Sequence, residues 1–450
     1  MRRQRRRLWV LVALVGLLLG GVLWWLAQKP PSIVVPPRQY PPNNAYDAYL
    51  QLAQAMEQLL RRDKRLEAIS LPLRNTLGSK PPVPEAEMRY YLQQMRPFLE
   101  AYRKHLTQPS AAVYEYDLKQ LNPNELFAFY DIARLEAMLI EDALEAGRAT
   151  EAVQRLKDLM RFSEQVRADG VPVHYFIGSL MIHAGLLPLR EQPTQLQSPE
   201  LLEALLTIAR AYEQQRASLK NVYQNSYYCG LGLYRKIAAS RTALLEALRD
   251  PITGQLLLST SSVERWLLES GLGVPLLWRK SFQEYRQYHQ KLFAELEKPL
   301  WQRKLVAPDY KGLINSVLFK PRGVNVLPLE PDFLGRVEQE EVATIRLLAC
   351  YAAVKRYYQQ RGVYPPSLEA LRPELGEMII DPFTGKPFVY RTDPKRGFQL
   401  YSVGENLTDD GGRLSVNRQQ GDLLPITEGA LPEEQRPSPT RLFSPPVWLR

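Results

Sequence analysis

The sequence predicts a mainly α-helical protein with a single N-terminal transmembrane helix, an extracytoplasmic α-helical domain and a small C-terminal α+β head. Three observations predict this fold class. Residues 8–27 form an uninterrupted run of apolar residues and glycine behind a cluster of arginines. Apolar residues then recur at helical spacing through most of 43–335. After Gly362 the pattern changes to turn sequences and alternating residues, which predicts an antiparallel hairpin.

The N-terminal segment has the length and the flanking charges of a transmembrane helix. About 20 residues at 1.5 Å each cross the ~30 Å core of a bilayer. Five arginines lie within residues 1–7, so the positive-inside rule predicts a cytoplasmic basic arm there and places the chain after Gln28 outside the cytoplasm. A cleaved signal peptide is the alternative. Its apolar core would be shorter, at about 7–15 residues, and Trp25 lies where a small residue is needed.

Two further predictions concern partners. Gly16 and Gly20 are spaced as a small-xxx-small pair, which predicts a homo-oligomeric contact through the transmembrane helix. Half of the formal net charge of +10 comes from the five N-terminal arginines, and the remaining chain mixes both signs without a basic stripe. This pattern argues against nucleic acid as a partner. The predicted partners are the membrane and other proteins of the cell envelope.

A linker and a helical domain follow the transmembrane helix. Residues 28–42 contain six prolines, which favours an extended polyproline-like spacer. The helical domain is predicted over 43–335 and begins with a helix capped by Asn43 or Asn44. Segments 126–146 and 150–168 form an αα-hairpin around Gly147. Segment 173–187 is apolar nearly all round, which favours a buried core helix over a second transmembrane helix.

The head is predicted at 336–412. Its first helix is expected to end near Arg361, because Gly362 can adopt the left-handed conformation that stops a helix. Ser367 is expected to cap a short second helix, which Pro373 ends. A tight turn at 381–385 then leads to strands near 388–391 and 398–403. The remaining residues, 413–450, form a proline-rich tail without periodicity that is predicted to be mostly disordered.

The segments 364–371 (YPPSLEAL), 381–390 (DPFTGKPFVY) and 400–404 (LYSVG) follow a long helix in this order. This arrangement resembles the globular head of the major pseudopilins of type II secretion systems. The resemblance implies a helix packed on a small antiparallel sheet, and a calcium site in the loop after the last strand. The matching positions are Glu405, Asn406, Asp409 and Asp410. Closely spaced oxygen ligands suit Ca²⁺, and a solvated acidic turn is the alternative.

Patterns for catalysis are missing from the sequence. No nucleophile elbow, phosphate-binding loop or dinucleotide-binding motif is found, and no metal-binding spacing relates the four histidines, His105, His174, His183 and His289. Cys229 and Cys350 either pair as a disulfide outside the cytoplasm or remain buried thiols.

The sequence therefore predicts no catalytic site and favours a membrane-anchored, non-catalytic scaffold or binding module. Two alternatives stay open. One is an accessory component of a secretion or pilus-like machine, which the resemblance of the head suggests. The other is a membrane-anchored hydrolase whose site is assembled from distant helices.

Overall fold

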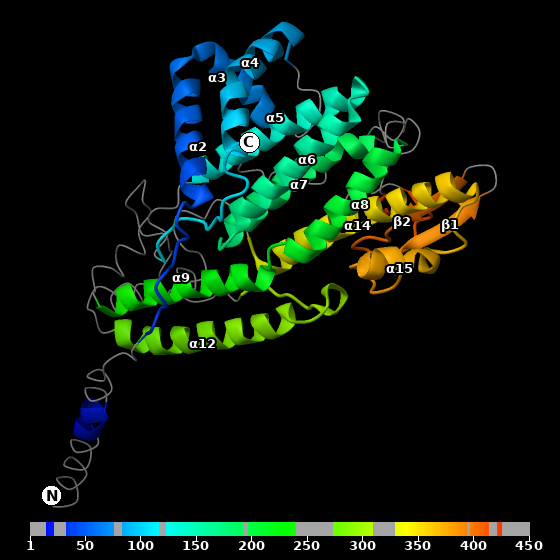
Figure 1. Ribbon diagram of the computed structural model, residues 1–450. Helices are drawn as coiled ribbons and strands as arrows, with labels where there is room; N and C mark the ends of the chain where they lie inside the picture. The colour runs from blue at the N-terminus through cyan, green and yellow to red at the C-terminus, as the bar shows by residue number, and fades with distance from the viewer. Residues whose placement is uncertain are drawn as a thin grey trace, which may run out of the picture.

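The computed structural model describes residues 15–21, 33–75, 83–116, 123–191, 197–239, 273–308, 329–393, 397–413 and 421–424. These residues are mainly helical and include a two-stranded antiparallel sheet, as the sequence predicts (Figure 1). The longer helices are α2 (Ala45–Arg62), α3 (Lys64–Asn75), α4 (Glu85–Arg103), α5 (Pro123–Glu145), α6 (Ala149–Arg167), α7 (Pro172–Glu191), α8 (Pro199–Gln215), α9 (Leu219–Ala239), α12 (Gly273–Leu296) and α14 (Pro331–Arg361).

Helices α5, α6 and α7 pack together at the centre of the helical part, and α2, α3 and α4 cover one end of them (Figure 1). The predicted αα-hairpin is confirmed: α5 and α6 meet at Gly147, whose φ is +71°. Asn44 caps α2 by accepting from the backbone N–H of Tyr46. Within the described part of the chain, α7 alone is long and apolar enough to cross a membrane, and 78% of that stretch is buried. It is therefore packed as the core helix that the sequence predicts.

Helix α14 belongs to both the helical part and the head. It packs along α7 and α8 and also contacts the short elements of the head. Its C-terminus is confirmed at Gly362, where φ is +71° and the backbone N–H donates to the carbonyl of Tyr358 at 2.8 Å. The helix begins earlier than expected, at Pro331, so the predicted boundary between 335 and 336 lies inside it. The two parts therefore share one continuous helix.

The head places η3 (Leu368–Leu371), α15 (Arg372–Leu375), η4 (Gly376–Ile379) and the β1–β2 hairpin against α14. Strands β1 (Val389–Asp393) and β2 (Gly397–Tyr401) pair antiparallel, close to the predicted positions.

Two local predictions in the head are wrong. Ser367 precedes η3 but makes no side-chain capping bond, because the segment is a short 3-10 turn entered from fully extended backbone. Pro373 does not end a helix. It lies in the first turn of α15, where the absence of a backbone N–H costs no hydrogen bond.

The proline-rich linker is attached to the helical part rather than acting only as a spacer. Arg38 Nη2 donates to the carbonyl of Ala112 at 2.8 Å, and the guanidinium lies 3.8 Å from the ring centroid of Tyr114. The Tyr40 hydroxyl donates to the carbonyl of Tyr114 at 2.9 Å. Residues 33–41 therefore follow the surface in an extended conformation that is fixed at Arg38 and Tyr40.

Part of the predicted tail also packs on the head. Leu423 and Ser402 exchange two backbone hydrogen bonds of 2.9 Å, and Arg190 donates to the carbonyl of Leu424. The prediction of a mostly disordered tail thus did not anticipate residues 421–424. Apart from Arg413, whose carbonyl accepts from the backbone N–H of Asp422 at 2.7 Å, the remainder of the tail lies outside the described residues, as does most of the predicted transmembrane helix.

Candidate functional site

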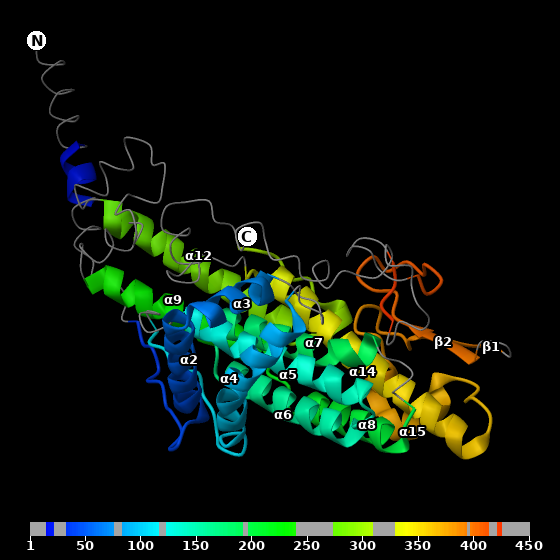
Figure 2. The ribbon, with the colours of Figure 1, turned by 90° about the horizontal axis from the view of Figure 1, so that it is seen from above.

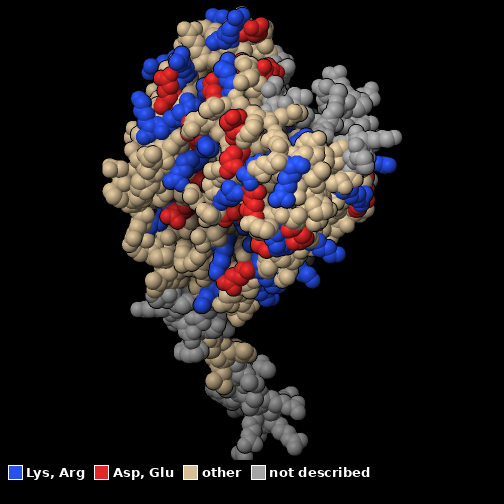
Figure 3. Space-filling view, turned by 45° about the vertical axis from the view of Figure 1, so that its right-hand side comes forward, with Lys and Arg blue, Asp and Glu red and all other residues tan. Residues whose placement is uncertain are grey.

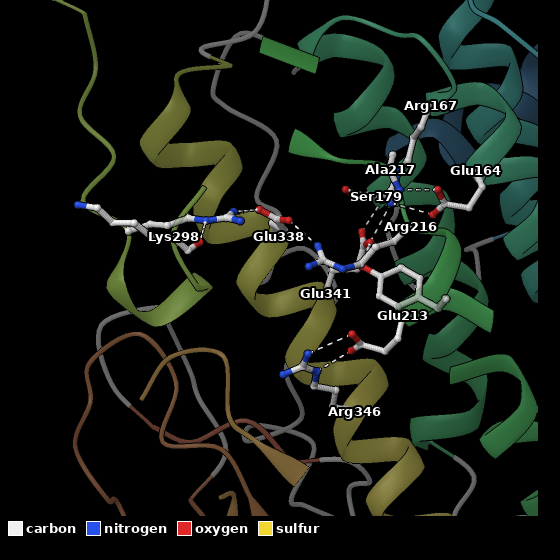
Figure 4. A network of polar contacts seen from close by, with 12 residues as sticks. Glu164, Arg167, Ser179, Glu213, Arg216, Ala217, Lys298, Glu338, Glu341 and Arg346 are labelled. Carbon is white, nitrogen blue, oxygen red and sulfur yellow. Dashed lines mark hydrogen bonds and ion pairs between the residues drawn. The ribbon is translucent and has the colours of Figure 1, made fainter. Parts of the chain in front are cut away.

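Helix α14 brings four charged side chains into the interior, namely Glu338, Glu340, Glu341 and Arg346, and all four are buried. Figure 4 shows three of them, Glu338, Glu341 and Arg346, where α14 meets α6, α7 and α8. Because a buried charge is costly unless it is paired and hydrogen-bonded, their partners decide what this part of the molecule can do.

The centre of the network is a two-point contact between Arg167 at the end of α6 and Glu341. The two Arg167 Nη atoms donate to the Glu341 carboxylate at 2.9 and 2.5 Å, and both side chains have no exposed area. The Tyr212 hydroxyl donates to the same carboxylate at 2.5 Å. Arg167 also donates to Ser179 at 2.7 Å and to Glu164 at 3.1 Å. Helices α6, α7, α8 and α14 are thus joined through the Arg167–Glu341 ion pair.

The two carboxylates that share Arg167 differ in their pKa. Burial favours the neutral form of Glu341, but the Arg167 guanidinium outweighs this effect and lowers the pKa of Glu341 below its usual value. Burial raises the pKa of Glu164, and the nearby Glu341 charge adds to that shift. Glu341 therefore carries the negative charge that balances Arg167, and Glu164 is the weaker partner.

Glu338 and Arg346 of α14 make equivalent contacts. Glu338 accepts from Arg216 at 2.5 Å and from Arg303 at 2.6 Å. Arg346 holds Glu213 in a two-point contact of 2.5 and 3.0 Å, and it donates to a head carbonyl, that of Ile380, at 2.9 Å. Every carboxylate drawn into this network therefore accepts from a guanidinium. We interpret the network as a clamp that fixes α14 between the helical part and the head.

Two histidines and both cysteines are buried, and burial shifts the pKa of each toward its neutral form at neutral pH. Burial lowers the pKa of His174 to about 3 and that of His289 to about 4, so both rings are neutral. Burial raises the pKa of each thiol, Cys229 and Cys350, to about 12. Both cysteines are free and buried, which matches the buried-thiol alternative rather than the disulfide.

Two of the four residues predicted to bind calcium are directed toward cations of the protein. Glu405 Oε1 lies 3.6 Å from Arg336 Nε on α14. Asp409 accepts from Arg391 at 2.8 Å and from the Tyr401 hydroxyl at 2.7 Å. These contacts lower the pKa of Asp409, with the Tyr401 hydrogen bond making the largest contribution. Glu405 and Asp409 therefore do not converge on one point.

The other two residues, Asn406 and Asp410, are brought together. Asn406 Nδ2 donates to Asp410 at 3.0 Å, and the backbone N–H of Gly421 donates to the same carboxylate oxygen at 2.9 Å. The buried Asp422 lies beside them, and its pKa is raised by burial and by the neighbouring carboxylates Asp410 and Asp409. Within the described residues, no three His, Cys, Asp or Glu side chains are arranged to hold a metal ion. In this structure the Asn406 and Asp410 side chains are held by hydrogen bonds within the head, and the calcium site stays a prediction.

Sequence reasoning missed the residues that define the network. The available signal was a run of charges, Glu338, Glu340 and Glu341, followed by Arg346, inside a long helix. Their partners are far away in the chain, as Arg167 precedes Glu341 by 174 positions, so no local pattern connects them. Asp422 was missed because its surroundings have the composition of a disordered tail.

Comparison with known proteins gives no match. No family model matches the chain, and no curated protein or solved structure is similar to it.

Proposed function

We propose that this chain is a membrane-anchored, non-catalytic scaffold or binding module outside the cytoplasm. The observation that carries the proposal is the apolar surface of the N-terminal helix. In the described residues 15–21, the large apolar side chains are 48–74% exposed, namely Val15, Leu17, Leu18 and Leu19. Burying each such side chain is worth about 1.5–3 kcal/mol, so a helix of this kind requires a surrounding apolar phase. A bilayer supplies that phase, and the preceding arginines orient the helix in it.

The buried network supports a scaffold rather than an enzyme. Its carboxylates and guanidinium groups are committed to one another, and the histidines and thiols with shifted pKa values are in neutral forms. The charged residues of the surface support a protein or membrane partner over nucleic acid. Figure 3 shows acidic and basic side chains lying next to one another over one face of the described residues.

The head is proposed to be pseudopilin-like in fold, with α14, the 3-10 turns and the β1–β2 hairpin as its parts. Its helix is not free to act as the stem of a filament. In pseudopilins an apolar helix continues directly into the head, whereas here the first half of α14 is buried against α7 and α8. This difference favours a scaffold over a subunit of a pilus-like assembly.

A fusion experiment tests the anchoring and the topology. A reporter that is active only outside the cytoplasm, fused after Arg450, is expected to be active in the wild-type chain. Replacing the five N-terminal arginines with glutamate should reduce that activity, because the orientation signal is removed. A wild-type fusion that is active only in the cytoplasm would show that the proposed topology is wrong.

A further inference from the structure

The hairpin of α9 and α12 ends on the side of the molecule where the N-terminal helix lies. The two helices pack closely: a Cβ on Gly230 would lie 2.0 Å from the Tyr285 hydroxyl oxygen, so only glycine fits there. Figures 1 and 2 both place the C-terminal end of α9 and the N-terminal end of α12 nearest to the helix at 15–21. The same views place the β1–β2 hairpin at the opposite end of the molecule.

The docked linker sets how far this end of the hairpin can lie from the proposed membrane anchor. The Arg38 guanidinium lies 5.8 Å from the Tyr116 ring centroid, and that ring lies 5.9 Å from the ring of Tyr228 on α9. Arg38 follows Ala27 by 11 residues, which span at most about 34 Å in a polyproline-like conformation. From Tyr228, α9 continues for 11 residues, or about 16 Å, to Ala239. The end of α9 is therefore within reach of the bilayer surface.

The residues at this end are basic and apolar. We call 231–239 of α9 and 273–286 of α12 the hairpin end. Its charged residues are one acid, Glu284, and five bases, Arg235, Lys236, Arg279, Lys280 and Arg286. Arg235 and Arg286 are exposed. The sequence of the first turns of α12 also contains three large apolar residues, Leu276, Leu277 and Trp278. Basic residues combined with tryptophan and leucine are typical of segments that bind at the interface of an anionic membrane.

We propose that the hairpin end binds anionic lipid headgroups of the bilayer that holds the N-terminal helix. The inference rests on the proposed membrane anchoring and deepens it. With a transmembrane helix alone, the helical part would be free to tilt about the linker. A second contact at the hairpin end fixes its orientation, so that the head is presented on the side facing away from the membrane.

Amide hydrogen exchange of the full chain in lipid nanodiscs tests the contact. Peptides from the hairpin end are compared in discs of phosphatidylcholine alone and in discs with added phosphatidylglycerol. A basic residue close to an anionic surface shifts the equilibrium about fivefold, so exchange is expected to slow at least fivefold in the anionic discs. The triple variant Arg235→Glu, Arg279→Glu, Lys280→Glu should lose this protection. A control with the same charge change, Arg61→Glu, Arg89→Glu, Arg96→Glu, alters exposed residues of α2 and α4 and should retain it.

The outcomes separate this inference from the anchoring on which it rests. If the chain co-purifies with discs but its hairpin end exchanges equally in both lipids, the lipid contact is wrong and the anchoring stands. Loss of protection in the control triple variant as well would also contradict a contact specific to the hairpin end. A chain that fails to enter discs overturns both proposals. Exchange in phosphatidylcholine discs shows whether the triple glutamate variant is folded. A milder triple variant, Arg235→Gln, Arg279→Gln, Lys280→Gln, should lose part of the protection.

Discussion

Replacing Arg167 with methionine should strongly destabilise the fold. The change leaves Glu341 buried without its cation, with the Tyr212 and Ser179 hydroxyls as partners, and it removes the Arg167 charge from beside Glu164. Removing one partner of a buried ion pair lowers the free energy of unfolding by about 3–5 kcal/mol. Glu341→Leu should cost less, because Arg167 keeps Glu164 and Ser179. The double variant Arg167→Met, Glu341→Leu should lose much less than the sum of the two, since neither charge is then left unpaired at this contact.

The cost of Arg167→Met should also increase with pH. In the wild type, Arg167 lowers the folded-state pKa of Glu341, so the stabilisation from this group is present above its unfolded pKa and is lost as pH falls. In the variant, burial without the cation raises the folded-state pKa of the carboxylates. The folded variant is then favoured at low pH and loses stability as pH rises through the raised pKa. The difference between the two proteins should be larger at pH 8 than at pH 5.

Urea unfolding of the full chain in detergent, followed by circular dichroism, measures these free energies. The matched control is the exposed pair of Arg61 and Glu57 on α2, where Arg61→Met and Glu57→Leu should each cost less than about 1 kcal/mol. If Arg167→Met costs no more than Arg61→Met, or if its cost does not change with pH, the buried network is not a clamp and the reasoning above is refuted.

Three further predictions follow from single features of the structure. Gly178→Ala should cost about 1–3 kcal/mol in urea unfolding, because its new Cβ would lie 2.5 Å from Arg167 Cγ and Nε; stabilisation by about 1 kcal/mol, as helix propensity alone predicts, would contradict this contact. His174→Gln should reduce the loss of stability between pH 7 and pH 5 by about 2 kcal/mol. Below the ordinary pKa of 6.5 the unfolded chain binds a proton at His174, whereas the folded ring, with a pKa of about 3, does not. Equal losses in the two proteins would argue against a buried neutral ring. If the head loop binds calcium, the melting temperature of the full chain should be several degrees higher in millimolar calcium than in chelator, because a hundredfold excess over Kd contributes about 2.7 kcal/mol. The double variant Asp409→Ala, Asp410→Ala should erase this difference. Identical melting of the wild type in both conditions would show that the loop is an acidic turn without calcium.

The elements that the sequence predicts well are those set by local physical rules. The hairpin of α5 and α6 depends on two periodic segments around Gly147, and the end of α14 depends on the left-handed conformation of Gly362. The start of α14 was missed because the segment before residue 342 carries Glu338, Glu340 and Glu341, which interrupt the apolar pattern. Those charges are accommodated only through tertiary partners, which periodicity does not reveal.

The same limit applies to the candidate site. The four residues named from the resemblance, Glu405, Asn406, Asp409 and Asp410, lie in the loop that follows β2. The directions in which these side chains point depend on cationic side chains that come from other helices and strands. Arg336 on α14 and Arg391 on β1 draw Glu405 and Asp409 apart. Spacing along the chain carries no information about such contacts.

Thiol labelling in intact cells tests the proposed anchoring and topology, because both native cysteines are buried and their thiols have a pKa of about 12. A single cysteine is introduced either at the exposed end of α14, as Gln360→Cys, or in the predicted cytoplasmic arm, as Arg3→Cys. With a maleimide that does not cross the cytoplasmic membrane, we expect Gln360→Cys to be labelled without disruption of that membrane and Arg3→Cys to be labelled only after it is disrupted. The reverse pattern, or labelling of neither variant before disruption, would contradict a scaffold anchored by one transmembrane helix with its body outside the cytoplasm.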